Sequence, residues 1–98
     1  MIYELRTYTL SPGGLREYMR LYNATGREVQ VAILGRLISL LQPESGDLNQ
    51  LIFLWAFDSF EDRRERRATL LENPQFTEFR KSVRQLLIRQ ESQLLSAI

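Results

Sequence analysis

The stretch LNQLIFLWAF, residues 48–57, places hydrophobic side chains on both of its alternating sets of positions. One set holds Leu48, Gln50, Ile52, Leu54 and Ala56, and the other holds Asn49, Leu51, Phe53, Trp55 and Phe57. Successive side chains of a strand point to opposite faces of the sheet, so this pattern predicts a strand that is covered on both faces. Helices are expected on one face and a different cover on the other.

A second apolar stretch, VQVAILGRLISLLQ at residues 29–42, comes before it, and the turn formers PESGD at 43–47 separate the two. We interpret residues 29–42 as another strand apolar on both faces. A helix remains an alternative, because periodicity alone does not distinguish a short buried strand from a buried helix. The two stretches together predict a β-hairpin.

The N-terminal segment IYELRTYTL, residues 2–10, is rich in β-branched and aromatic residues and predicts a further strand. Residues 11–26 follow with helical spacing of apolar residues, with Ser11 as the expected N-cap and Pro12 at the first helical position. Gly26 is the expected end of this helix.

Two helix starts are predicted in the second half of the chain. Ser59 precedes a helix as its N-cap, with Asp62 three residues later as an acidic capping partner. Asn73 and Pro74 begin another helix, whose apolar stripe holds Phe76, Phe79, Val83, Leu86 and Leu87. The final segment, residues 88–98, is ambiguous, because its pattern fits either an extension of this helix or a last strand.

A last strand would complete a β-α-β-β-α-β order, which predicts an α+β fold of the ferredoxin-like class, with an antiparallel sheet and helices on one face. The other face would then expose a large apolar patch, which a soluble monomer rarely tolerates. We therefore expect a homodimer that packs two open sheet faces together around a small cavity, a dimeric α/β barrel.

Composition narrows the function. A chain of 98 residues fits one domain, residues 1–98. The chain has no cysteine and no histidine, which excludes disulfides, metal sites built on thiolates or histidines, and a Ser-His-Asp triad. We expect no metal and no cofactor. A net charge of +1 argues against a nucleic-acid partner, and the lack of a long apolar run or signal-peptide pattern predicts a cytoplasmic protein without a membrane span.

The stretch SFEDRRERRATL, residues 59–70, holds four arginines within five positions. Acidic residues between Asp58 and Glu72 balance these arginines, so the segment predicts an exposed helix with ion pairs along its surface rather than a phosphate-binding surface. Arg64 or Arg67 lies beside the apolar stripe, and one of their side chains is a candidate to pack inward and hold a carboxylate or a strand carbonyl.

Several motifs resemble the NIPSNAP family of dimeric α/β-barrel proteins over nearly the whole chain. They are Glu4-Leu5-Arg6-Thr7-Tyr8, the Glu44-to-Trp55 hairpin with Gly46, Leu48, Asn49 and Gln50, and the Asp62-Arg63 and Arg67 helix leading to Asn73-Pro74. The resemblance implies that the final segment is a strand and that the protein is a dimer, but it supplies no reaction. Ser39 and Phe53 depart from the family pattern, which commonly has glycine and histidine there.

The candidate ligand-binding residues are Glu4, Arg6, Tyr8, Asn49 and Trp55. We expect them, with Phe53, to point to the open face, where polar groups would converge in an apolar cavity. The alternative is that Glu4 and Arg6 only pair across the dimer. The leading function is a homodimeric structural or small-ligand-binding module. The other is a cofactor-free monooxygenase-like or isomerase-like enzyme, in which Arg6 orients an oxyanion and Tyr8 or Glu4 handles protons.

Overall fold

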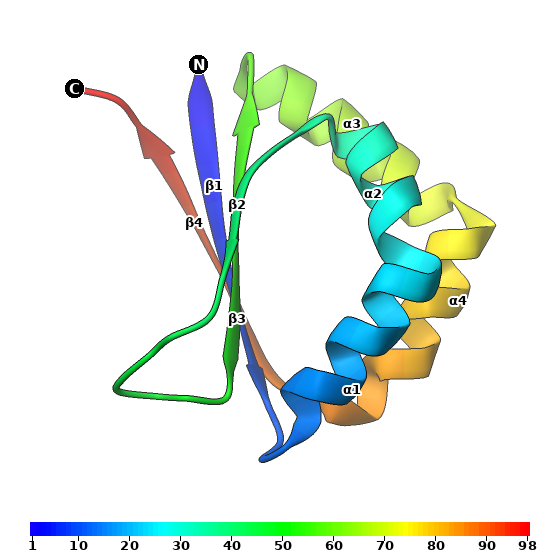
Figure 1. Cartoon of the computed structure of the whole chain (residues 1–98). Coiled ribbons are helices and arrows are strands. Elements are labelled where there is room, and N and C mark those ends of the chain that lie inside the picture. Colours follow the sequence, from blue (N-terminus) through cyan, green and yellow to red (C-terminus); the bar gives the residue numbers. More distant parts are fainter.

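The computed structural model describes residues 1–98 as one antiparallel four-stranded sheet with all helices on one face (Figure 1). The strands pair in the order β2-β3-β1-β4. The elements along the chain are β1 (Ile2–Leu10), α1 (Gly14–Leu21), the π-helical turn η1 (Tyr22–Gly26), α2 (Arg27–Leu34), β2 (Arg36–Leu41), β3 (Gln50–Phe57), α3 (Phe60–Glu72), α4 (Pro74–Val83), the 3-10 turn η2 (Arg84–Leu86) and β4 (Leu87–Ser96). The predicted ferredoxin-like order and the final strand are confirmed.

The first helical region is longer than predicted. Residues 14–34 form one continuous helical segment, in which the π-helical turn joins α1 to α2. The segment begins after Gly13 (φ 79°), which is the N-cap in place of the predicted Ser11. The Gly14 amide donates a hydrogen bond to the Ser11 carbonyl in the turn that precedes the helix. Gly26 does not end the helix either, since α2 follows it directly. Its missing side chain instead leaves room for the ring of Phe79, whose Cγ lies 2.8 Å from the position of an added Cβ.

The strand prediction for residues 29–42 is therefore wrong in its first half and right in its second. Residues 29–34 are the end of α2, and Gly35 ends that helix with a φ of 96°, a left-handed conformation that side chains other than glycine rarely adopt. The chain then enters β2, which forms the predicted hairpin with β3. An apolar run is buried equally well in either element, and this explains the error.

Both helix starts in the second half are confirmed. The Ser59 hydroxyl accepts a hydrogen bond from the Asp62 amide at 3.0 Å, and the Asp62 carboxylate accepts one from the Asp58 amide at 3.1 Å. At α4, the Asn73 side chain accepts from the Phe76 amide at 2.9 Å, and Pro74 is the first helical residue. Local capping chemistry thus fixes both boundaries.

The register of β1 decides which residues face the helices. Glu4 lies opposite Trp55, Arg6 opposite Phe53 and Tyr8 opposite Leu51, so all of them share one face of the sheet. That face is the one packed against the helices. The expectation that Glu4, Arg6, Tyr8, Phe53 and Trp55 point to the open face is therefore wrong.

The core between sheet and helices is largely aromatic. Phe53 stacks on Trp55 with ring centroids 6.1 Å apart, and its edge also meets Tyr22 at 5.5 Å. Tyr18 meets Phe79 of α4 edge to face at 5.6 Å. Such contacts join the sheet to both helical regions and hold the backbone around the candidate site.

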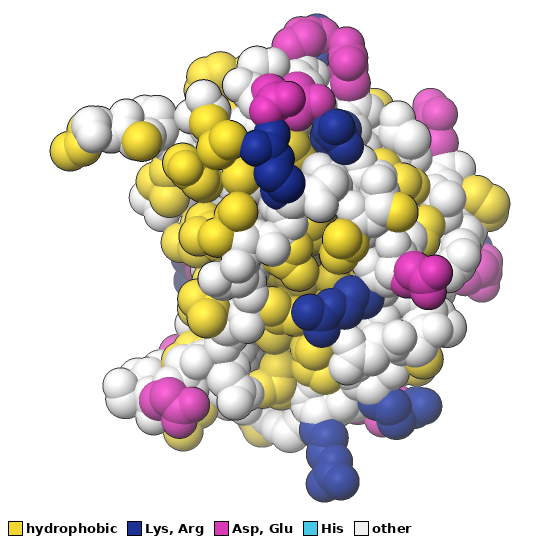
Figure 2. Space-filling view, turned by 45° about the horizontal axis from the view of Figure 1, so that its top comes forward, with side chains coloured by type: hydrophobic (Ala, Val, Ile, Leu, Met, Phe, Trp, Pro, Cys, Tyr) yellow, Lys and Arg dark blue, Asp and Glu magenta, His cyan; other side chains and the backbone are white.

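The opposite face of the sheet has no helix over it (Figure 1). Its hydrophobic members include Tyr3, Leu5, Leu41, Ile52, Leu54, Ala56 and Leu95. Figure 2 shows hydrophobic side chains gathered along the left side of the molecule, where the sheet lies. β4, at the sheet edge, is exposed along almost all of its length. No helix has both the length and the apolar character needed to cross a bilayer.

Candidate functional site

Glu4 is the centre of a charged cluster beneath the helices. Its side chain is fully buried. It accepts hydrogen bonds from Arg63 Nε at 3.1 Å and Nη2 at 2.8 Å, from Arg6 Nη1 at 3.0 Å and from Ser92 Oγ at 2.6 Å. These partners come from α3, β1 and β4. The carboxylate therefore joins the sheet to α3.

The surroundings keep Glu4 ionised. Burial alone raises the pKa of its carboxyl, but the hydrogen bonds from Arg63 and Ser92, together with the charges of Arg67 and Arg6, outweigh burial and bring the pKa to about 2. Both oxygens are already engaged by donors. Glu4 is thus a fixed counter-ion and not a proton acceptor near neutral pH.

Arg67 has one unmet donor in the same cluster. Its Nη1 lies 3.7 Å from Glu4 Oε1, is buried, and makes no hydrogen bond. Burial lowers the pKa of Arg67, and the nearby Arg6 lowers it further. Three guanidinium groups, those of Arg6, Arg63 and Arg67, surround the single Glu4 carboxylate, so the cluster carries excess positive charge.

The arginine-rich segment is resolved into two kinds of contact. Arg64 pairs with Glu61 and Arg66 pairs with Asp62 along the surface of α3, so the predicted ion pairs are present. Arg67 packs inward, as the sequence allowed, whereas Arg64 does not. Arg66 Nη1 also donates to the Ile33 carbonyl at 3.0 Å, which ties α3 to the end of α2. Arg63, the other inward residue, belongs to the Asp62-Arg63 motif of the family resemblance, but its inward packing was not predicted.

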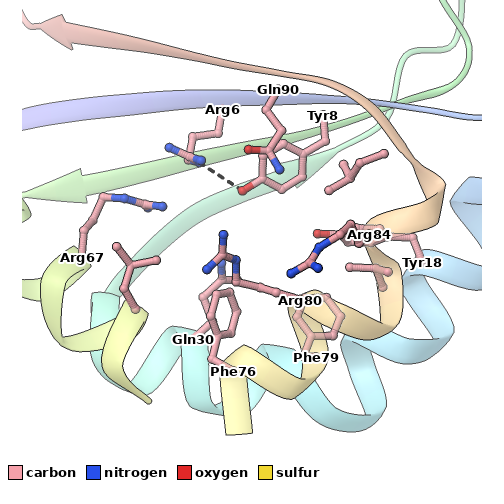
Figure 3. A pocket seen from close by; sticks show the side chains of 13 residues that line it. Arg6, Tyr8, Tyr18, Gln30, Arg67, Phe76, Phe79, Arg80, Arg84 and Gln90 are labelled. Carbon is pink, nitrogen blue, oxygen red and sulfur yellow. Dashed lines mark hydrogen bonds between the residues drawn. The ribbon is translucent and has the colours of Figure 1, made fainter. Parts of the chain in front are cut away.

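A cavity of about 150 Å³ lies between the sheet and the helices, next to Arg67 (Figure 3). Its lining residues are Arg6, Tyr8, Tyr18, Gln30, Arg67, Leu71, Phe76, Phe79, Arg80, Val83, Arg84, Leu87 and Gln90. One wall is aromatic and aliphatic and comes mainly from α4. The rest is polar, and no Asp or Glu lines the cavity.

Arg80 and Arg84 extend the positive lining toward solvent. Both residues are exposed, and neither forms an ion pair within the chain. Figure 3 shows their guanidinium groups directed into the same space, below Arg6 and Tyr8. Gln90 of the exposed strand β4 lies on the opposite side of the cavity. The cavity thus opens where the helices leave β4 uncovered.

Tyr8 and Arg6 form the sheet side of the cavity. Arg6 Nε donates to the Tyr8 hydroxyl at 3.1 Å, shown as the dashed line in Figure 3. Burial alone would lower the pKa of Arg6. The charges and hydrogen bonds of Tyr8 and Glu4 outweigh burial, so the pKa is raised. Tyr18 packs beside Tyr8, and burial raises the pKa of its hydroxyl. The guanidinium and hydroxyl groups can donate hydrogen bonds, and they suit the binding of an anion or of an uncharged acceptor.

Only Arg6 and Tyr8 of the candidate ligand-binding residues line the cavity. Glu4 lies behind Arg6 as its counter-ion, and Trp55 is a core residue stacked on Phe53. Asn49 lies next to the end of β1, where its carbonyl accepts from the Leu10 amide at 2.7 Å. No group of three or more acidic, histidine or cysteine side chains forms a metal-binding cluster.

The helical part of the cavity was not anticipated from the sequence, apart from the inward option for Arg67. A signal was available in the arginine spacing. Arg63 and Arg67, and likewise Arg80 and Arg84, are separated by four residues and therefore share a helix face. Both pairs flank apolar residues that pack on the sheet.

Comparison with known proteins gives a consistent result. The NIPSNAP family model matches residues 3–98. A NipSnap homolog from Dictyostelium discoideum is 32% identical over 77 residues, which cover 79% of this chain and 34% of the relative. The chain thus spans about a third of the length of that curated relative.

Solved structures extend the comparison. A protein from Agrobacterium tumefaciens, described as a nipsnap family protein with unknown function, is 35% identical and superposes with a TM-score of 0.96, covering 100% of this chain and 94% of that one. A putative antibiotic biosynthesis monooxygenase from Nitrosomonas europaea shares the fold with a TM-score of 0.73 but only 10% identity, over 100% of this chain and 99% of that one. Because the family model extends over almost all residues and the relatives agree with it, the chain belongs to the NIPSNAP family.

Proposed function

We propose that this chain is a homodimeric ligand-binding module whose cavity takes a small, anionic and partly apolar molecule. The observation that carries the proposal is the excess positive charge next to the cavity, where the lining residues Arg6 and Arg67 share the single Glu4 carboxylate with Arg63. Buried charges without a full counter-charge destabilise the protein. A bound anion would reduce that cost.

The charges around the cavity support an anion. Four arginines line it, namely Arg6, Arg67, Arg80 and Arg84, and no carboxylate does. Both oxygens of Glu4, the acidic residue of the neighbouring cluster, already accept hydrogen bonds from the chain. Guanidinium groups match the planar geometry of a carboxylate and bind it through paired hydrogen bonds.

The size and the apolar wall limit the rest of the ligand. A cavity of about 150 Å³ in a protein core is large enough to hold benzene. Phe76, Phe79 and Val83 provide a surface against which a ring or a branched aliphatic group can pack. A carboxylate on a single ring fits both requirements.

The homodimer is proposed for the open face of the sheet. This face presents Leu5, Ile52, Leu54 and other apolar side chains to solvent in the single chain. A contiguous exposed apolar surface is typical of an interface. A second copy presents the same surface, so a two-fold arrangement covers both faces at once. The ligand cavity lies on the other side of the sheet, within each protomer.

Calorimetry with benzoate and benzamide tests the ligand class. These molecules have nearly the same shape, but only benzoate is an anion. We expect benzoate to bind and to raise the melting temperature, and benzamide to bind at least tenfold more weakly. Arg67→Met should weaken the preference for benzoate, because it removes one positive charge from the cavity lining and keeps an unbranched side chain.

Arg64→Met is the matched control. Arg64 lies on the same helix but pairs with Glu61 at the surface and does not line the cavity. This variant should bind benzoate like the unmodified protein. If neither benzoate nor other single-ring or short aliphatic carboxylates bind, or if Arg67→Met leaves their affinity unchanged, the proposed ligand class is wrong.

The second candidate is an enzyme that uses the same cavity. The observation in its favour is the Arg6 and Tyr8 pair, whose hydrogen-bonded side chains face the cavity. Glu4 is unsuited to proton transfer there, because its pKa is about 2 and its oxygens are occupied. NMR of each bound carboxylate after long incubation in air tests this candidate. A new product that Tyr8→Phe suppresses would favour the enzyme over the binding module.

A further inference from the structure

We infer that Gln30 provides a second ligand contact and selects, among ring carboxylates, those that carry an additional hydrogen-bond acceptor. The inference rests on the proposed function and makes the ligand class narrower. It is argued from the contacts of Gln30 and from the helical turn that positions it.

Gln30 is a buried polar residue with a free donor. It is only 4% exposed, lies on α2 and lines the cavity. Its Oε1 accepts a hydrogen bond from the Tyr22 hydroxyl. Its Nε2 donates to no group of the chain, and it is not sealed within the protein. The amide N–H groups are therefore left at the cavity surface.

Tyr22 fixes the orientation of this amide. Tyr22 is fully buried, and Gln30 is the only hydrogen-bond partner of its hydroxyl. Burial raises the pKa of Tyr22, so the hydroxyl keeps its proton and needs an acceptor. If the amide were reversed, the hydroxyl proton would face an N–H group and remain unsatisfied in the core. The observed orientation, with the amide nitrogen turned to the cavity, is thus favoured.

The π-helical turn brings the two side chains together. In a regular α-helix, residues eight positions apart differ by about 80° around the axis, whereas residues seven apart differ by only about 20°. A π-helical turn inserts one extra residue, so Gln30 takes the angular position that residue 29 would otherwise have above Tyr22. Gly26 within this turn permits the close contact with Phe79, another lining residue.

Gln30 and Arg67 therefore offer two different contacts in one cavity. Arg67 supplies a positive charge from α3, and Gln30 supplies a neutral donor from α2. Figure 3 shows Gln30 on the helix side of the cavity, across from Arg6 and Tyr8. A ring that places its carboxylate at the arginines can present a second acceptor to the Gln30 amide.

Pyridine carboxylates provide the probe. Nicotinate and isonicotinate have almost the size of benzoate but carry a ring nitrogen that accepts a hydrogen bond. We expect at least one of them to bind the unmodified protein about fivefold or more tightly than benzoate, since an additional hydrogen bond contributes about 1 kcal/mol. Pyrrole-2-carboxylate, which carries an N–H donor instead, should bind no better than benzoate.

The variant is the double substitution Tyr22→Phe with Gln30→Leu. It replaces both partners by apolar groups and leaves no orphaned hydroxyl in the core. It should lose the preference for the pyridine carboxylate over benzoate. The single variant Tyr22→Phe frees the amide to rotate and should reduce the preference without abolishing it.

The outcomes separate the two proposals. If benzoate binds through Arg67 but nicotinate and isonicotinate show no advantage, or if the double variant keeps that advantage, the role of Gln30 is wrong and the anion site remains. A preference for the donor-bearing pyrrole would mean that the amide is reversed and would also overturn it. If no carboxylate binds at all, the proposed function fails and the role of Gln30 fails with it.

Discussion

Arg63 of α3 donates two hydrogen bonds to the Glu4 carboxylate of β1, from Nε to Oε1 at 3.1 Å and from Nη2 to Oε2 at 2.8 Å. The two residues are 59 positions apart in the chain. Their two-point contact fixes both the distance and the angle between α3 and the central part of the sheet. Because Arg67 follows one turn later on α3, the same contact also determines where its guanidinium group meets the cavity.

Glu4→Gln should destabilise the protein strongly. The substitution keeps the shape of the side chain but leaves the guanidinium groups of Arg6, Arg63 and Arg67 without a counter-charge in a buried site. Removing one partner of a buried ion pair costs about 3–5 kcal/mol. Urea denaturation at fixed protein concentration measures this loss. Glu61→Gln, which affects only an exposed pair, should leave the midpoint unchanged.

A second substitution checks the electrostatic cause. Adding Arg67→Met to Glu4→Gln removes one of the uncompensated charges and should recover part of the lost stability. If Glu4→Gln unfolds at the same urea concentration as the unmodified protein, the cluster does not stabilise the fold.

Stability should fall in acid because of Glu4. Its pKa is about 2 in the folded protein and 4.5 in the absence of the fold, so the unfolded chain binds the proton more readily. The stabilisation by the ionised Glu4 carboxylate is fully present above pH 4.5 and is lost as the pH falls from 4.5 to about 2. Each unit of pKa difference between the unfolded and folded states corresponds to about 1.4 kcal/mol, so this stabilisation amounts to about 3 kcal/mol. Unfolding free energies measured across this range should show a smaller decline for Glu4→Gln; equal declines would contradict the assignment to Glu4.

Gly26→Ala should disturb the π-helical turn. The added Cβ would lie 2.8 Å from Cγ of Phe79, a ring that is itself buried and unable to move away freely. Overpacking of this kind costs about 1–3 kcal/mol. Thermal unfolding measures the loss, and Phe79→Leu in the same chain should relieve part of it. Additive effects of the two substitutions would show that the contact is not the cause.

Leu54→Glu should dissociate the proposed homodimer. Leu54 lies on β3 opposite Leu5, in the middle of the open sheet face, where a buried carboxylate would have no partner. Sedimentation should report a dimer for the unmodified protein and a monomer for Leu54→Glu. Glu65→Lys, on the exposed surface of α3, is the control and should remain dimeric. A stable monomer of the unmodified protein at micromolar concentration would refute the dimer.

Local signals allowed much of the fold to be predicted. β1 begins and ends where alternation predicts, and the caps at Ser59 and Asn73 define the starts of α3 and α4 because each depends on residues within one turn. The end of α2 was missed for the opposite reason. Residues 29–34 are apolar enough for a strand or a helix, and only their packing in the folded protein decides between them.

The candidate site was harder to predict because sequence alternation assigns residues to two faces without saying which one is covered. Glu4 and Arg6 were expected on the open face on account of their charge. Their charges are in fact neutralised beneath the helices, by Arg63 and by each other. That compensation depends on a residue 59 positions away, which no local pattern reveals.

The position of β1 between β3 and β4 also has a consequence for synthesis. β1 leaves the ribosome before the other strands of this sheet, yet its two neighbours are β3 and β4, and its register with β4 reaches from Ile2 to Ser96. Pairings so distant in sequence form slowly. β1 therefore has no strand partner until β3 has been synthesised, so we expect chaperones that hold extended apolar segments to engage it at that stage.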